Sequence, residues 1–125
     1  MKEINIYSLV EAGNNLKDEI LEKYLEYNSI KIKKNEVYDI SSLVESLSEI
    51  SDDINLFDGF FVGYSIPQIS KEFDLLRFHS DSIVNIEIKK QSTEEAIKKQ
   101  LNKNKYYLSF LDKPTYGYTY IVNED

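Results

Sequence analysis

Two stretches of alternating apolar and polar residues lie on either side of a polar turn in the middle of the chain. They cover residues 72–78 (EFDLLRF) and 83–89 (IVNIEIK), and residues 79–82 (HSDS) separate them. Period-two alternation in runs rich in Phe, Leu, Ile and Val is typical of strands, and turn-forming residues between two such runs predict a hairpin. We expect Phe78 to pair with Ile83 across the turn.

In that register, two carboxylates lie opposite each other. Asp74 faces Glu87, and directly opposite residues of an antiparallel pair share a face, with Cβ atoms roughly 4.5–5.5 Å apart. Two carboxylates so placed repel each other, and a bound cation is the simplest way to make the arrangement favourable. Glu72 lies opposite Lys89, and we expect these two residues to form a cross-strand salt bridge. The hairpin therefore predicts a cation site on one face of a sheet.

The second strand of the hairpin has a polar row and an apolar row. Glu87 and Lys89 are two residues apart and project from one face, together with Asn85. The alternate positions are all apolar (Val84, Ile86 and Ile88). We expect the apolar row to pack on the core, and the polar row to present the metal site from a rigid scaffold.

The remaining patterns predict three helices and two further strands. Apolar residues at helical spacing follow Asn14 and Asn15, and they also follow capping-box patterns that begin at Ser42 and Ser92. The expected elements are helices over 16–27, 43–50 and 94–111 and strands over 56–64 and 116–122. With the hairpin, the order is α-α-β-β-β-α-β, which predicts an α/β fold in a single domain over residues 1–125.

Composition narrows the chemistry of the expected cation site. The chain has no cysteine, which excludes thiolate catalysis and cysteine zinc sites, and its single histidine, His79, excludes sites built from several imidazoles. A metal must therefore be held by oxygen ligands. Oxygen ligands favour magnesium, manganese or calcium.

Charge and hydropathy bear on partners and location. The net charge of −7 argues against a free-standing nucleic-acid binder. Residues 89–105 nevertheless carry six lysines against two glutamates, so one face is expected to be basic. No apolar run approaches the length of a membrane span or a targeting segment, so we expect a cytoplasmic protein without membrane contact.

Asp74, followed thirteen residues later by Glu87-Ile-Lys89, resembles the Asp…(Asp/Glu)-x-Lys motif of the PD-(D/E)XK superfamily, the restriction-endonuclease-like nucleases. The core of that family is a mixed β-sheet flanked by helices, with the acidic residues on a central hairpin, and the order of elements expected here is similar. Phe73 stands where the family often has proline. The substrate-specific insertions of many relatives are absent.

Gln100, on the helix after the Lys89 strand, resembles the glutamine of the RecB-like and exonuclease-like branches of this superfamily. In those branches a tyrosine follows the glutamine on the same helix. Tyr106 or Tyr107 would fill that place here, at an unusual spacing.

The resemblance implies a magnesium- or manganese-dependent nuclease that hydrolyses DNA phosphodiester bonds. Asp74 and Glu87 would hold the metal, Lys89 would position or activate water, and Gln100 would support the constellation. Other residues of the helix and its approach would contact nucleic acid (Lys90, Lys98, Lys99, Lys103 and Tyr107).

Other interpretations of the sequence stay open. The domain is expected to work in a larger assembly, either beside a helicase or ATPase domain or as a homo-oligomer, in DNA repair, restriction or phage defence. The main alternative is a catalytically silent PD-(D/E)XK-like module that binds nucleic acid or protein. A third is an ion-binding or interaction module with an accidental motif. The lysines of the basic helix have an ordinary explanation as a solvated face, and the sequence does not decide between DNA and RNA or between endonuclease and exonuclease action.

Overall fold

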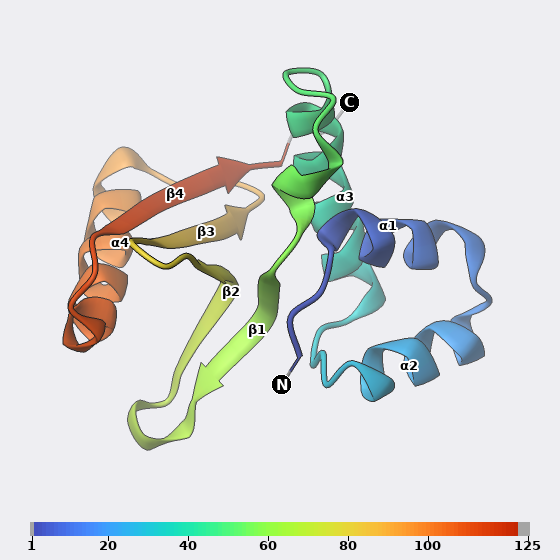
Figure 1. Ribbon diagram of the computed structural model, residues 1–125, viewed down its shortest axis with the longest axis horizontal. Coiled ribbons are helices and arrows are strands. Elements are labelled where there is room, and N and C mark those ends of the chain that lie inside the picture. The colour runs from blue at the N-terminus through green and yellow to red at the C-terminus, as the bar shows by residue number, and fades with distance from the viewer. Residues whose placement is uncertain (1, 123–125) are drawn as a thin grey trace. The chain divides into compact units, whose positions relative to one another are not determined.

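The chain forms two compact units, residues 1–63 and residues 64–125, in a computed structural model that describes residues 2–122 (Figure 1). The first unit is helical up to the start of a strand, and the second contains the sheet and one long helix. None of the helices within residues 2–122 is both long and apolar enough to cross a membrane. The single domain expected from the sequence stays a prediction.

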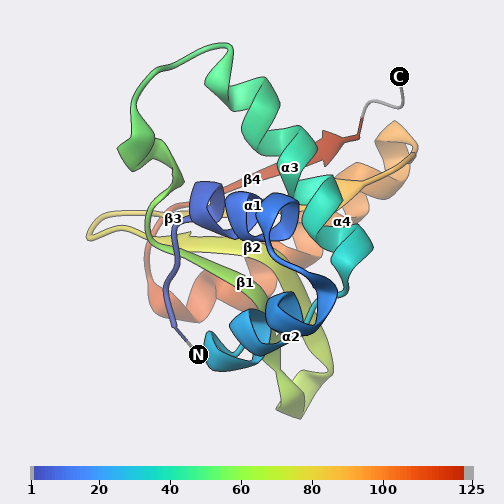
Figure 2. The same ribbon diagram turned by 90° about the vertical axis from the view of Figure 1, so that its right-hand side faces the viewer.

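Three helices make up most of the first unit, where the sequence pattern predicted two. They are α1 (Ile6–Asn15), α2 (Asp18–Tyr27) and α3 (Lys34–Ser48). Helix α1 was missed, although Asn5 caps it by accepting a 3.1 Å hydrogen bond from the Ser8 N–H. Helices α1 and α3 lie side by side (Figure 2), and buried Gly13 allows the close approach of Val37.

The start of α3 also differs from the expectation. The helix begins at Lys34, so Ser42 lies inside it and caps nothing. The first turn is instead closed by Glu36, whose side chain accepts a 3.4 Å hydrogen bond from the Lys33 N–H. The observed order is therefore α-α-α-β-β-β-α-β, and the predicted order with two leading helices is wrong.

The second unit is built on a mixed sheet with strand order β1-β2-β3-β4. Its strands are β1 (Phe60–Ile66, of which residues 64–66 belong to this unit), β2 (Lys71–Phe78), β3 (Ile83–Lys89) and β4 (Thr115–Ile121). Strands β2 and β3 are antiparallel, and β4 is parallel to β3. The α/β class expected from the sequence is confirmed, and the sheet is mixed.

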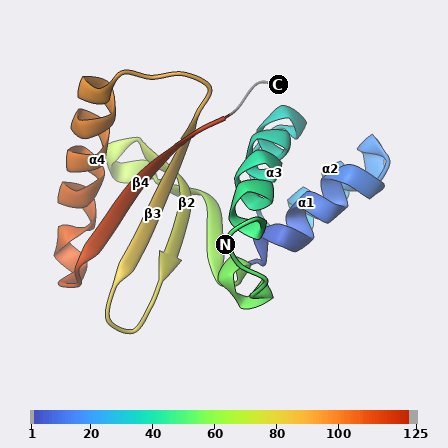
Figure 3. The ribbon, with the colours of Figure 1, turned by 90° about the horizontal axis from the view of Figure 1, so that it is seen from above.

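Helix α4 (Glu94–Leu108) connects β3 to β4 and packs along β4 (Figure 3). Thr93 caps it through a 3.1 Å hydrogen bond from the Ala96 N–H, one residue later than the expected cap at Ser92. On the sheet side, a Cβ added to Gly117 would lie 3.2 Å from Leu101, so the helix and β4 approach closely at this glycine.

The hairpin has the predicted register but not the predicted core face. Phe78 pairs with Ile83, and the ladder continues to Leu75 opposite Ile86. The polar row of β3 is the buried one: Asn85 is 0% and Glu87 1% exposed. The apolar row is only half-buried (Val84, Ile86 and Ile88). The expectation that the apolar row is the one packed on the core is therefore wrong, because α4 covers the polar row through Gln100 and Asn104.

Candidate active site

The carboxylates of Asp74 and Glu87 each accept a backbone N–H of the opposite strand at the point where the β2–β3 ladder ends. The Asp74 N–H donates to Glu87 Oε2 at 2.8 Å, and the Ile88 N–H donates to Asp74 Oδ2, also at 2.8 Å. Beyond the Leu75–Ile86 pair, carboxylate oxygens thus receive backbone N–H groups on both strands. This exchange fixes the two carboxylates on adjacent strands.

Glu87 is buried in a polar environment that includes α4. Its Oε1 accepts a 3.1 Å hydrogen bond from Gln100 Nε2, and its Oε2 accepts a second bond, at 3.2 Å, from Asn85 Nδ2. Burial, followed by the negative charge of Asp74, raises the pKa of Glu87. The hydrogen bonds from Asp74 and Asn85 and the positive charge of Lys71 oppose this rise. Glu87 is therefore an acid whose ionised form costs free energy unless a cation comes close.

Two asparagines extend this polar cluster into the interface between α4 and β3. Asn85 Nδ2 donates to the Leu75 carbonyl at 3.1 Å as well as to Glu87, and Asn104 Nδ2 donates to Asn85 Oδ1 at 2.9 Å. Asn104 is 1% exposed. Asn104 belongs to no motif of the sequence, although it follows Gln100 by four residues and therefore shares its helix face.

Lys71 is a further residue near the site that the sequence pattern does not predict. It begins β2, and its charge acts favourably on ionised Glu87. Its ammonium lies 5.2 Å from the centre of the Phe73 ring, a distance at which a cation interacts with an aromatic face. No spacing rule in the sequence marks this lysine.

Lys89 lies on the expected strand without the expected partner. It is half-buried at the end of β3, two residues after Glu87 and thus on the same face. Within residues 2–122, no ion pair joins Lys89 to Glu72, Asp74 or Glu87, so the expected Glu72–Lys89 salt bridge is wrong. The Lys89 ammonium is therefore not held by these carboxylates.

The four lysines expected to contact nucleic acid are exposed, whereas Tyr107 is half-buried. Lys90 follows β3 and is exposed, as are the α4 lysines expected to contact nucleic acid (Lys98, Lys99 and Lys103). Lys98 forms an ion pair with Glu94 at 3.4 Å. Tyr107 is half-buried against Tyr106, with ring centroids 5.7 Å apart. The place one helical turn after Gln100 belongs to Asn104 rather than to either tyrosine.

The carboxylate pair fits a sparsely liganded cation better than an all-protein metal cage. Among residues 2–122, no group of three or more Asp, Glu, His or Cys side chains is arranged to hold a metal ion. Asp74 and Glu87 supply two carboxylates. Magnesium is commonly bound by one or two carboxylates while it keeps several waters, so two facing carboxylates match its needs.

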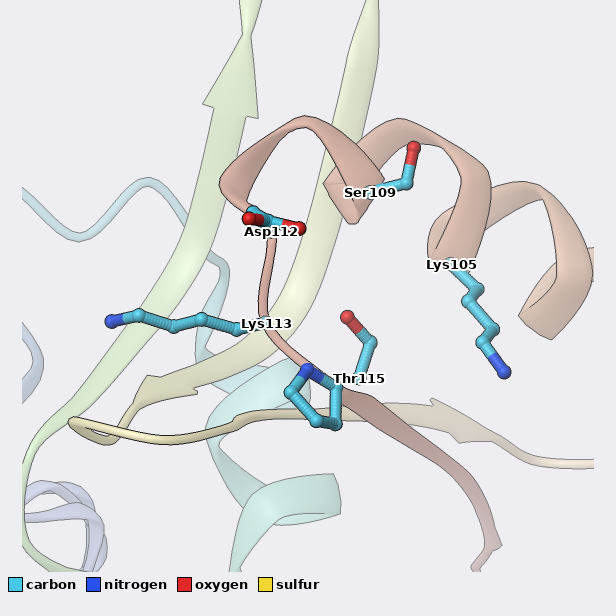
Figure 4. Close-up of a pocket in the computed structure, with 6 residues that line it drawn as sticks. Lys105, Ser109, Asp112, Lys113 and Thr115 are labelled. Carbon is cyan, nitrogen blue, oxygen red and sulfur yellow. The ribbon is translucent and has the colours of Figure 1, made fainter.

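A separate cavity of about 260 Å³ lies where α4 passes into the 3₁₀ helix η3 (Ser109–Leu111) and on to the start of β4. Figure 4 shows its lining residues (Lys105, Ser109, Asp112, Lys113, Pro114 and Thr115). Lys113 Nζ donates to the His79 carbonyl at 3.1 Å, and Ser109 Oγ donates to the Tyr106 carbonyl at 2.6 Å. Because these polar groups already have intramolecular partners, the cavity is a weaker candidate site than the carboxylate pair.

Comparison with protein-family models, with curated proteins and with solved structures finds no match to this chain.

Proposed function

We propose that this protein is a magnesium- or manganese-dependent nuclease that hydrolyses phosphodiester bonds in DNA. The observation that carries the proposal is the reciprocal fixing of Asp74 and Glu87 by the backbone N–H groups of Ile88 and Asp74, respectively. A protein gains little stability from two anions held together, and burial makes the pair more costly. A bound divalent cation would relieve that cost.

The donor set suits such a cation. Glu87 Oε1 accepts from Gln100 and Asp74 Oδ2 accepts from Ile88, and each of these two oxygens has a second lone pair for a metal. Glu87 Oε2 already accepts two hydrogen bonds, from Asp74 and Asn85. The backbone carbonyl of Ile88 lies next in sequence to Glu87 and is a candidate third oxygen ligand. When bound there, the cation would supply Lewis acidity for attack of water on a phosphodiester.

Lys89 is the proposed partner of the attacking water. Its side chain shares the face of Glu87, and it is not neutralised by an ion pair with Glu72, Asp74 or Glu87 within the described residues. An ammonium in this position orients water by hydrogen bonding and stabilises negative charge that builds on the phosphate in the transition state.

Gln100 is the proposed support of the carboxylate pair. Its amide donates to Glu87 Oε1, the oxygen that does not accept from Asp74, so it fixes the rotation of the carboxylate. Ligand orientation by such outer contacts commonly affects metal affinity and activity by 10- to 100-fold.

The exposed lysines supply the proposed contact with the DNA backbone. Lys90 follows β3, and Lys99 and Lys103 are one turn apart on α4. With a net charge of −7, the chain is proposed to act together with a basic partner surface, such as a helicase or ATPase domain or further copies of itself.

Cleavage assays test the proposal directly. Supercoiled plasmid, linear duplex and single-stranded oligonucleotides are incubated with Mg²⁺, with Mn²⁺ or with EDTA. We expect cutting that requires the metal and falls at least 100-fold in Asp74→Asn, Glu87→Gln and Lys89→Ala.

Two matched variants control for charge. Glu72→Gln removes an exposed carboxylate two residues before Asp74 on the same strand, and Lys23→Ala removes an exposed ammonium on α2. Both are expected to cut like the wild type. If the wild type binds DNA but cuts no substrate with either metal, the silent binding module is the better account.

A further inference from the structure

Helix α4 and strand β3 face each other with matched polar pairs. Gln100 donates to Glu87 and Asn104 donates to Asn85, so residues four apart on the helix meet residues two apart on the strand. Four helical residues rise about 6 Å and two strand residues span about 6.6 Å, so the two intervals agree. The register of α4 on β3 is thus specified by two amide hydrogen bonds rather than by apolar packing alone.

Asn85 connects α4 to Glu87, because its amide bonds to both Asn104 and Glu87. Both bonds of its Nδ2 are directed at acceptors, Glu87 Oε2 and the Leu75 carbonyl, which leaves Oδ1 directed at α4. Asn104 supplies the donor that this buried oxygen needs. An asparagine amide can turn over by half a rotation, and its orientation is decided by its partners. Without a donor on α4, Asn85 loses the contact that keeps its NH₂ group directed at Glu87.

We propose that Asn104 is a positioning residue that acts through Asn85 to fix Glu87 Oε2. The orientation claim stands on the hydrogen bonds alone, and its consequence for catalysis rests on the proposed nuclease function. The Asn104 amide makes no hydrogen bond to Glu87 itself. By donating to Asn85 Oδ1, it keeps the NH₂ group of Asn85 directed at Glu87. Asn104 Oδ1 is itself buried without a hydrogen-bond partner among the described residues. Such an unpaired buried oxygen costs stability. A leucine has the same branched shape, with somewhat more bulk, and would remove that cost together with the donor to Asn85.

Asn104→Leu separates positioning from packing when it is compared with Leu108→Ala. Leu108 is buried one turn further along the same helix, so its truncation loosens α4 without touching an amide. The first measurement is the ¹⁵N–¹H spectrum of the Asn85 side-chain NH₂ group and its exchange with solvent. The second is the affinity for Mn²⁺, and the third is kcat and KM on a DNA substrate.

We expect Asn104→Leu to shift the Asn85 NH₂ signals and speed their exchange, to weaken Mn²⁺ binding by roughly 10- to 100-fold, and to lower kcat with little change in KM. Leu108→Ala is expected to lower thermal stability while it leaves the Asn85 signals in place. If folded Asn104→Leu keeps the wild-type Asn85 signals, the proposal is overturned. Wild-type protein that binds no Mn²⁺ would instead contradict the nuclease proposal, and the Asn85 spectrum would still decide the orientation claim.

Asn104→Ala is the second variant if the leucine does not fold. It removes the same donor without adding bulk between α4 and β3. The same shift of the Asn85 signals is expected, and unchanged signals overturn the proposal in the same way.

Discussion

The Asp74 and Glu87 carboxylates are fixed reciprocally: Glu87 accepts from the N–H of Asp74, and Asp74 accepts from the N–H of Ile88, each at 2.8 Å. On each strand, a carboxylate oxygen accepts a backbone N–H of the other strand, in the place where a ladder carbonyl would otherwise accept it. Neither side chain can swing into solvent without leaving a backbone N–H unpaired. The arrangement keeps two negative charges close even though the charge of Asp74 opposes ionisation of Glu87.

The first prediction concerns the free energy of unfolding of Glu87→Gln. Burial and the charge of Asp74 raise the pKa of Glu87 in the folded protein above its ordinary value, so the unfolded chain ionises first as the pH rises. The free energy of unfolding therefore falls as the pH rises from the ordinary glutamate pKa of about 4.3 through the raised pKa of Glu87 in the folded protein. We expect Glu87→Gln to be more stable than the wild type at pH 7.5 and equal to it near pH 4, by urea unfolding without metal.

Glu72→Gln is the matched control, because Glu72 is exposed on the same strand as Asp74. Its stability is expected to stay close to that of the wild type at both pH values. A Glu87→Gln variant that is less stable than the wild type at pH 7.5 would contradict the assigned cost of the buried carboxylate.

The second prediction concerns stabilisation by metal. A ligand that binds only the folded state at a hundredfold excess over its Kd adds about 2.7 kcal/mol, or roughly 10 °C in Tm for a chain of this size. We expect Mn²⁺ to raise the Tm of the wild type in this way and to leave Asp74→Asn and Glu87→Gln nearly unchanged. An equal rise in all three proteins would assign the metal to another place.

The third prediction concerns the contact of α1 with α3. A Cβ added to Gly13 would lie 2.7 Å from Val37 Cγ1, and the branched valine has little freedom to move aside. We expect Gly13→Ala to destabilise the protein by about 1–3 kcal/mol, although alanine favours helices. In a double-mutant cycle, Val37→Ala should remove most of that penalty. Additive effects of the two substitutions would contradict a close contact between Gly13 of α1 and Val37 of α3.

The fourth prediction concerns the lysines of α4. Lys98 is paired with Glu94, whereas Lys99 and Lys103 have no ion pair among the described residues. Removing a lysine that contacts phosphate should reduce the slope of log K against log salt by about 1. We expect this loss for Lys99→Ala and Lys103→Ala and a smaller one for Lys98→Ala, by fluorescence anisotropy on duplex DNA. Equal slopes in all variants would place the DNA on another face.

The sequence predicted the hairpin closely because its determinants are local. The alternation of Glu72–Phe78 and Ile83–Lys89 and the length of the turn together set the register from Phe78 and Ile83 onwards. Which face is buried is not a local property. Alternation marks two faces of β3, but the burial of Asn85 depends on Asn104, which lies nineteen residues away on α4.

The missed parts of the fold had weaker signals. Helix α1 has Ile6, Leu9, Val10 and Gly13 on one buried face, so its periodicity was present in a short and partly polar segment. Lys71 gave no signal, since its effect on Glu87 depends on the three-dimensional path of β2.

The most direct test of the account is a crystal structure with Mn²⁺ soaked in at pH 7.5. A cation bound beside Glu87 would favour its ionised form at this pH. We predict an anomalous difference peak between the carboxylates of Asp74 and Glu87, within coordination distance of an oxygen of each, and no such peak in Glu87→Gln. A wild-type crystal at saturating Mn²⁺ without density between these two residues would contradict the proposed metal site.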